Sequence, residues 1–249
     1  MRVVITSDFH IKYFEKEEDI ERRNRVENFL KSLIGKIDCL ILAGDIFDLW
    51  LEWNTVIIKN YFNVLKILAD LRVSGCKIIF LMGNHDFLLD RFLTDFIGCE
   101  IYENFYESEI NGKKIYVSHG DLFTQNDIRY RVFRMLVRSR FSKWLCRILH
   151  PNIILKWGVK LSRTSRENND FDKKQKRKMT VKREQGLIDK AVLLSNDYDI
   201  IVFGHSHIPV RMEINNSIYL NCGDWVSNNS FVFFDEEICI LKKETTFEN

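Results

Sequence analysis

The hydrophobic and polar positions of this chain predict short strands that alternate with longer amphipathic helices. Continuous apolar runs are typical of buried strands, and apolar residues spaced three and four apart are typical of helices packed on one face. Strands are predicted at residues 3–6, 38–43 and 76–81, with helices at 16–34 and 55–71 between them. This strand–helix–strand–helix–strand order predicts a parallel sheet joined by crossover helices.

A different pattern begins near residue 100, where alternating residues flank Asn111-Gly112 and predict a hairpin. A polar stretch at 164–178 predicts a loop, and a helix capped by Thr180 is expected to follow it. The remaining predicted elements are the hairpin strands 100–109 and 113–118, a helix at 180–194, a strand at 199–203 and a second hairpin at 210–214 and 217–221.

Between these two halves lies a segment of different composition. Residues 126–163 are helical in pattern, basic, and rich in Phe, Trp and Leu. We therefore predict one domain over residues 1–249, with a basic helical cap inserted into it at 126–179.

Charge is distributed unevenly. The whole chain carries a net charge of +2, but Arg129–Arg183 holds 18 Lys/Arg and 3 Asp/Glu, a local net of +15 that leaves −13 elsewhere. An ordinary helical surface mixes both signs, so this segment predicts an anionic partner.

Polar side chains follow five of the predicted strands directly. Ligands of open α/β sheets bind at the carboxyl ends of strands, so these side chains are expected to meet at one edge. Five of the six histidines belong to this set, which is hard to explain by structural roles alone. The set is Asp8, His10, Asp45, Asn84, His85, His119, His205 and His207.

Imidazole and carboxylate ligands together suit the borderline divalent metals Mn, Fe, Zn, Co and Ni. No cysteine belongs to the set, which excludes a Cys-rich structural zinc site. The ligands also outnumber those that one tetrahedral ion uses. Two ions that share a carboxylate would use them all, and such a pair suits hydrolysis of a phosphate ester.

These motifs resemble the calcineurin-like metallophosphoesterases: Asp8-x-His10, Gly44-Asp45, Gly83-Asn84-His85-Asp86, His119 and Gly204-His205-x-His207 occur in order. The resemblance implies an αββα fold, a β-sandwich flanked by helices. It implies that Asp8, His10 and His207 bind one ion and that Asn84, His119 and His205 bind the other. Asp45 would bridge the ions, His85 would contact the phosphate and assist the leaving group, and Asp86 would orient His85.

The insert bears on the substrate. Residues 129–147 hold seven basic residues and no acidic one, with apolar residues spaced for one helical face. This pattern suits a membrane surface with anionic head groups, or a cap that lines an acyl-chain pocket. A helix packed on the core with a solvated basic face is the alternative. Nucleic acid is not expected as a partner, because a DNA-binding helix would interleave more polar residues.

A narrower resemblance extends over nearly the full length, insert included. The segments Gly44–Trp50, Gly83–Leu88, His119–Arg134 and Asn221–Trp225 are similar to the UDP-2,3-diacylglucosamine hydrolases of lipid A biosynthesis. That family releases UMP and 2,3-diacylglucosamine 1-phosphate, and the resemblance implies two manganese ions. His85 stands where many of its members carry arginine. The implied substrate contacts are Asn84, His85, Asp127, Ser165, Asn169 and His205.

Two alternatives stay open: a general phosphodiesterase or nucleotide hydrolase of the same fold, and a non-catalytic scaffold. Six cysteines without a C-x-x-C pair indicate reduced thiols, and the first strand leads so directly to Asp8 that we expect no signal peptide. No apolar stretch is long enough to span a membrane. We expect a cytoplasmic protein, peripheral on the inner face of the inner membrane, with a nucleotide-linked lipid as its substrate.

Overall fold

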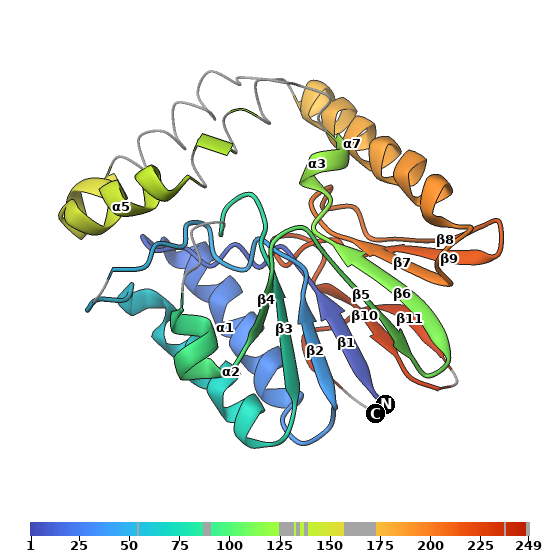
Figure 1. Cartoon of the computed structure of the whole chain (residues 1–249), viewed down its shortest axis with the longest axis horizontal. Helices are drawn as coiled ribbons and strands as arrows, with labels where there is room; N and C mark the ends of the chain where they lie inside the picture. Colours follow the sequence, from blue (N-terminus) through green and yellow to red (C-terminus); the bar gives the residue numbers. More distant parts are fainter. Residues whose placement is uncertain are drawn as a thin grey trace.

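Two β-sheets lie face to face, with helices against their outer faces (Figure 1). The computed structural model describes residues 1–53, 55–86, 91–124, 132, 135–136, 139–156, 173–236 and 238–247. This arrangement confirms the predicted α/β class with helices flanking a two-layer sandwich.

The first sheet has the strand order β11-β10-β1-β2-β3-β4, and its strands β1 to β4 are parallel. Helices α1 (Glu17–Ser32) and α2 (Phe62–Val73) cover its outer face, with the short turns η1 (Lys59–Tyr61) and η2 (Leu93–Ile97) beside them. The strands are β1 (Val3–Thr6), β2 (Cys39–Leu42), β3 (Lys77–Leu81), β4 (Glu100–Tyr102), β10 (Ser230–Phe234) and β11 (Cys239–Lys243).

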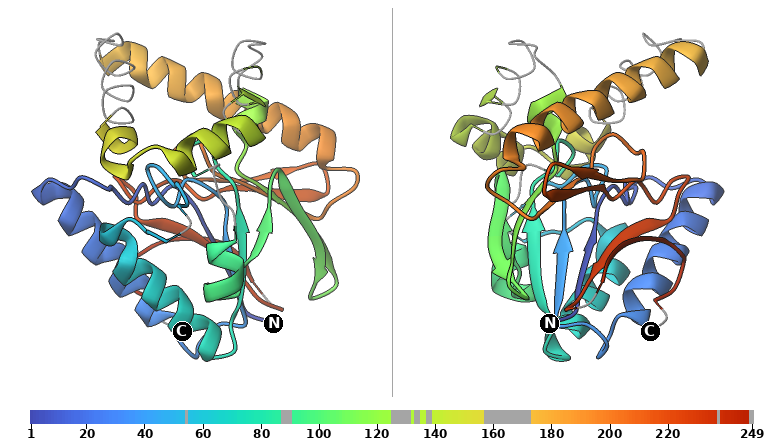
Figure 2. Two further views of the ribbon diagram at one scale, coloured as in Figure 1. Left: turned by 60° about the vertical axis from the view of Figure 1, so that its left-hand side comes forward. Right: turned by 90° about the vertical axis from the view of Figure 1, so that its right-hand side faces the viewer.

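The second sheet has the order β5-β6-β7-β9-β8, in which β6, β7 and β9 run parallel. The long helix α7 (Lys173–Leu194) packs on its outer face and on the single turn α3 (Asp121–Thr124) (Figure 2). The strands are β5 (Phe105–Ile110), β6 (Lys113–Ser118), β7 (Ile200–Phe203), β8 (Val210–Ile214) and β9 (Ser217–Asn221).

Alternation along each strand divides the side chains between separate cores. In β2, Leu40 and Leu42 pack with the helices, whereas Cys39 and Ile41 pack between the two sheets. Successive side chains of a strand point to opposite faces, so one fully apolar strand fills two layers. The sheets are therefore rigid supports for the loops at their carboxyl ends.

Several sequence predictions were wrong in detail. The stretch 100–109 is not one hairpin strand: β4 pairs with β3 in the first sheet, and only β5 pairs with β6. Helix α2 begins at Phe62 rather than near residue 55. Thr180 lies inside α7 rather than at its start, and residues 173–178 of the predicted loop are helical.

The described part of the insert contains helices at α5 (Arg140–Ile148) and at 151–156, besides the first turns of α7. Within this described part, Trp53 Nε1 donates a hydrogen bond to the carbonyl of Leu149 at 3.3 Å, and Leu155 packs against the first core. Among the described helices, none is both long and apolar enough to cross a membrane.

Candidate metal centre

The loops that follow β1, β2 and β7 share an unusual backbone conformation. Asp8, His10, Asp45, His205 and His207 have φ values of 56°, 47°, 55°, 66° and 64°. Left-handed backbone is unfavourable for residues with a Cβ and persists only where surrounding contacts enforce it. The other three described non-glycine residues with positive φ are all asparagine, which tolerates it better. Strain is therefore concentrated at the residues whose chemistry the sequence singled out.

Backbone hydrogen bonds hold these loops against one another. The N–H of Asp8 donates to Gly44 at 3.1 Å, and the N–H of His10 donates to the carbonyl of Asp45 at 3.0 Å. Glycine is required at position 83, because a Cβ there would overlap the Asp45 carboxylate. The ends of β1, β2 and β3 are thus locked into one rigid edge.

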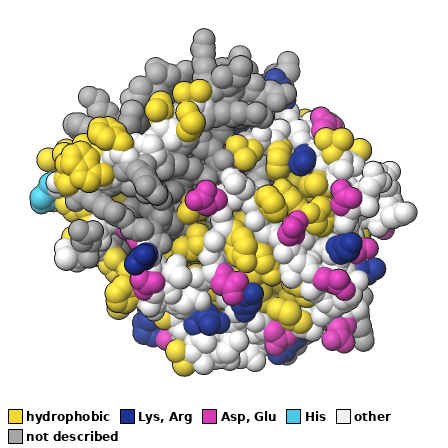
Figure 3. All heavy atoms as spheres, in the orientation of Figure 1, with side chains coloured by type: hydrophobic (Ala, Val, Ile, Leu, Met, Phe, Trp, Pro, Cys, Tyr) yellow, Lys and Arg dark blue, Asp and Glu magenta, His cyan; other side chains and the backbone are white. Residues whose placement is uncertain are grey.

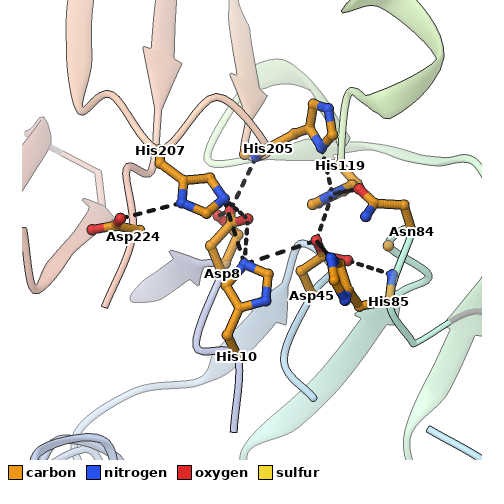
Figure 4. Close-up of polar contacts among 12 residues, drawn as sticks. Asp8, His10, Asp45, Asn84, His85, His119, His205, His207 and Asp224 are labelled. Carbon is orange, nitrogen blue, oxygen red and sulfur yellow. Dashed lines mark hydrogen bonds and ion pairs between the residues drawn. The ribbon is translucent and has the colours of Figure 1, made fainter. Parts of the chain in front are cut away.

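The first group of ligand atoms comes from the ends of β1 and β7. Oδ1 of Asp8 lies 3.3 Å from Nε2 of His207 and 3.6 Å from Nε2 of His10, and the two imidazole nitrogens are 3.4 Å apart. On its other side the His207 ring meets Asp224, with 3.2 Å between Nδ1 and Oδ2. This contact turns Nε2 of His207 toward Asp8 and His10 (Figure 4).

The second group gathers around His119, which follows β6. Its Nε2 lies 3.1 Å from Oδ1 of Asn84 and 3.2 Å from Nδ1 of His205. Its Nδ1 lies 3.0 Å from the carbonyl of Ala43. Because a carbonyl only accepts, this contact places the proton on Nδ1 and leaves Nε2 free to act as a ligand.

Asp45 lies between the two groups. Its Oδ2 is 3.4 Å from Nε2 of His119 and 3.9 Å from Nε2 of His10. Its other oxygen accepts the backbone N–H of His85 at 2.9 Å. One carboxylate oxygen therefore faces both sets of ligand atoms while the other holds the loop after β3 (Figure 4).

The donor set fits divalent cations. The ligand atoms of Asp8, His10 and His207 lie within 4.8 Å of one another, as do those of Asp45, His119 and His205. Oδ1 of Asp8 and Nε2 of His205 are buried, and neither has a well-aligned hydrogen-bond partner among the described residues. Buried polar atoms without partners are costly, and a cation bound at each group would satisfy them.

The pKa shifts of the site also indicate that it favours bound cations. Burial opposes charge on Asp8 and Asp45, but His207 beside Asp8 and His119 beside Asp45 hold the pKa of both carboxyls below the usual range. In return, the carboxylates outweigh burial and raise the pKa of His119 and of His207 to about 10. For His205, burial and the neighbouring His119 lower the pKa to about 3. The two carboxylates thus stabilise positive charge next to them, whether metal cations or protonated histidines carry it.

A cavity of about 490 Å³ opens over these ligands. His85 stands at its wall with 35% of its side chain exposed, and its Nδ1 lies 2.9 Å from the carbonyl of Asp48. Three cationic side chains, Lys12, Arg22 and Arg183, line the cavity together with the carboxylates Glu18, Asp19, Asp45 and Asp48. Lys12 pairs with Asp48 at 2.8 Å and Arg22 with Asp19 at 2.6 Å, so the cavity wall carries both signs of charge.

Asp86 differs from its expected role. Its buried carboxylate does not contact the His85 ring but accepts backbone N–H groups of Gly83 and Ile46, both at 2.7 Å. The ring of His85 is oriented by Asp48 instead. Asp86 therefore shapes the loops that carry the ligands.

All eight residues predicted at strand ends are brought together, whereas Asp127, Ser165 and Asn169 lie outside the described residues. Sequence reasoning assigned no role to Asp224, although it follows the carboxyl end of β9 as the other polar residues follow their strands. It also missed Glu184 and Arg183 of α7, for which the periodicity of a basic helix gave no signal.

The fold and these residues define a metal-dependent hydrolase of phosphate esters or pyrophosphates. Residues 1–209 match the calcineurin-like phosphoesterase family, and the chain belongs to that family. This establishes the class suggested by the sequence motifs and supplies the expectation of divalent metal ions.

Curated relatives carry a more specific name. A UDP-2,3-diacylglucosamine hydrolase of Porphyromonas gingivalis is 26% identical over 269 residues, covering 99% of both chains. A protein of the same name from Pseudomonas putida is 27% identical over 212 residues, covering 83% of this chain and 82% of the relative. An archaeal phosphodiesterase of known structure shares the fold, with a TM-score of 0.50, 18% identity, and coverage of 97% and 98%.

Proposed function

We propose that this protein hydrolyses UDP-2,3-diacylglucosamine to UMP and 2,3-diacylglucosamine 1-phosphate at a centre of two divalent ions. The observation that carries the proposal is the position of Asp45 between two groups of ligand atoms. The names of relatives aligned over nearly the whole chain support the substrate.

In this proposal Asp8, His10 and His207 hold one ion, and Asn84, His119 and His205 hold the other. Asp45 would be shared by both ions, since its carboxylate lies 3.4 Å from Nε2 of His119 and 3.9 Å from Nε2 of His10. Manganese is the proposed metal, since imidazole, carboxylate and amide oxygen suit it. When bound, the ions polarise the phosphoryl oxygens and lower the pKa of an attacking water.

His85, which follows the proposed ligand Asn84 in the chain, completes the reacting site. The carbonyl of Asp48 accepts the Nδ1 proton of His85, which leaves Nε2 to face the cavity. A protonated Nε2 donates to a phosphoryl oxygen and then to the departing oxygen of the sugar phosphate. Arginine holds charge but does not release a proton at neutral pH, so His85 adds an acid that an arginine lacks.

The cavity and the insert supply the substrate contacts. Arg183, which lines the cavity, is proposed to offer charge to the diphosphate, whereas Lys12 and Arg22 already pair with Asp48 and Asp19. Asp127, Ser165 and Asn169 are proposed to contact the glucosamine or phosphate from the insert. The cap at 126–179 is then the part of the domain that receives the acyl chains.

The same insert is proposed to rest on the cytoplasmic face of the inner membrane. In α5, Phe141, Trp144 and Ile148 are 67%, 55% and 58% exposed. Hydrophobic side chains gather on this part of the surface (Figure 3). Apolar residues at this density, on the most basic segment of the chain, suit an anionic lipid surface.

The test compares two substrates in the presence of manganese: UDP-2,3-diacylglucosamine and bis(p-nitrophenyl) phosphate. We expect fast release of UMP from the lipid and slow cleavage of the small diester. Asp45→Asn is expected to abolish both, whereas Asp70→Asn, which removes an exposed ion pair with Lys66 on α2, should leave both unchanged. Fast cleavage of the diester with no lipid turnover would move the protein to the general phosphodiesterases.

A further inference from the structure

A buried carboxylate outside the proposed ligand set lies directly behind it. Glu184 of α7 is 6% exposed and accepts three hydrogen bonds: from Ser206 Oγ at 2.5 Å, Tyr219 Oη at 2.7 Å and Asn221 Nδ2 at 3.0 Å. A buried carboxylate destabilises the fold unless hydrogen bonds replace its lost hydration. The three donors provide those hydrogen bonds to Glu184. Hydroxyl and amide groups, rather than a cation, satisfy Glu184.

Ser206 is the residue between His205 and His207. Both neighbours have left-handed backbone, with φ values of 66° and 64°, so the loop is strained on either side of the serine. Such a conformation persists only where other contacts hold it. The Oγ of Ser206 provides several at once, because it donates to Glu184 and accepts from the N–H of Ile208 at 3.2 Å.

Asn221, at the end of β9, closes the network. Its Nδ2 contacts Ser206 Oγ at 2.9 Å and the carbonyl of Gly204 at 3.0 Å, besides Glu184. The loop that carries both histidines is therefore fixed from the sheet by Asn221 and from the helix by Glu184. Without Glu184, Ser206 would lose its acceptor and α7 would lose this polar connection to the loop.

The position of Glu184 in α7 adds a second consequence. Arg183, its immediate neighbour, lines the cavity, and Leu187 one turn later is fully buried against the second sheet. The network therefore fixes the part of α7 that presents a cation to the cavity.

We infer that Glu184 is a positioning residue for the metal centre: through Ser206 it holds the backbone that aims His205 and His207 at their ions. The inference rests on the ligand roles given to these histidines in the proposed function. Glu184 itself contacts neither substrate nor ion. Groups that orient ligands in this way typically cost about 10–100-fold in metal affinity when removed.

The test measures metal affinity directly, by cobalt(II) titration of the metal-free protein with the visible absorption of bound cobalt as the readout. We expect Ser206→Ala to weaken binding about 10-fold and to change the absorption band, since the ligand geometry shifts. Glu184→Ala should do the same. Because both substitutions remove the hydrogen bond between Ser206 and Glu184, the double variant should bind cobalt no more weakly than the weaker-binding single variant.

Tyr219→Phe is the matched control, because it removes a hydrogen bond to Glu184 without touching the loop. It should lower stability and leave cobalt affinity and the absorption band unchanged. Unchanged affinity in Ser206→Ala, or an equal loss in Tyr219→Phe, would overturn the inference. Failure of the proposed substrate is distinguishable, because a general phosphodiesterase would still bind cobalt and show the same order among the variants. A wild type that binds no cobalt would instead remove the ligand roles on which the inference rests.

Discussion

The carboxylate of Asp86 accepts the backbone N–H of Asp45 at 3.2 Å, across the gap between the loops after β3 and β2. The same carboxylate accepts the N–H of Gly83 and of Ile46, both at 2.7 Å. The backbone of Asp45, the central residue of the metal site, is thus held in its left-handed conformation by a second buried carboxylate that accepts hydrogen bonds from backbone N–H groups. The two loops form one unit.

Removal of Asp86 tests this relationship. Asp86→Ala leaves several buried N–H groups without an acceptor, and we expect the free energy of unfolding to fall by about 3–5 kcal/mol. Urea denaturation with a chelator present measures the loss independently of metal. Asp70→Ala, which breaks an exposed ion pair on α2, should cost under about 1 kcal/mol. Equal losses in the two variants would show that Asp86 does not organise the loops.

Metal stoichiometry tests the division of ligands between two ions. The wild type should retain two manganese ions per chain after buffer exchange. His207→Gln removes a ligand from the group that includes Asp8, and His205→Gln removes one from the group around His119. Each variant should retain one ion, as counted by atomic emission. Loss of both ions in each variant would indicate a single interdependent site.

His85 is expected to act on turnover rather than on metal binding. Its Nε2 is 4.0 Å from Asp45 and its ring is partly exposed in the cavity. His85→Ala should lower kcat by about 10²–10⁴-fold, the usual contribution of a general acid. The stoichiometry of bound metal should stay at the wild-type value. His85→Arg should recover binding of the diphosphate but not the wild-type kcat. A variant that loses metal would contradict the role.

The metal-free protein should lose stability as the pH rises. Despite burial, Asp45 and Asp8 raise the pKa of His119 and His207 to about 10 in the folded chain, against about 6.5 when unfolded. Their stabilising contribution is fully present below about pH 6.5 and is lost as the pH rises through about 10.

Denaturation with chelator present, at several pH values, measures this slope. His207→Gln carries only one such histidine, so its slope should be smaller than that of the wild type. Saturating manganese should reverse the trend for the wild type, because metal binding requires neutral imidazole. If the stability of the wild type depended on pH equally with chelator and with manganese, the protonation assigned to the site would be contradicted.

Much of the centre was predictable because parallel strands bring their carboxyl ends to one edge. Asp8, Asp45 and His119 each follow a strand directly, so their meeting required only the strand pattern. Glu184 was not predictable, since it lies in a basic helix and its partners come from β9 and the loop after β7. Its burial depends on how the helix packs against the sheet.

The errors in the fold have similar causes. Alternation between residues 100 and 110 continues from β4 to β5, and nothing local shows that these strands belong to different sheets. The start of α7 was missed because residues 173–178 carry no apolar residue, although Lys, Arg and Gln all favour helix. Hydrophobic periodicity identifies a helix by its buried face, so a helical segment without a buried face is not predicted.

The most direct test of the account is hydrolysis of UDP-2,3-diacylglucosamine in water enriched in oxygen-18, with both products examined by mass spectrometry. We expect one labelled oxygen in UMP and none in 2,3-diacylglucosamine 1-phosphate, because water attacks the phosphorus attached to uridine. Label in the lipid product, or no turnover of the lipid by protein that carries two ions, would contradict it.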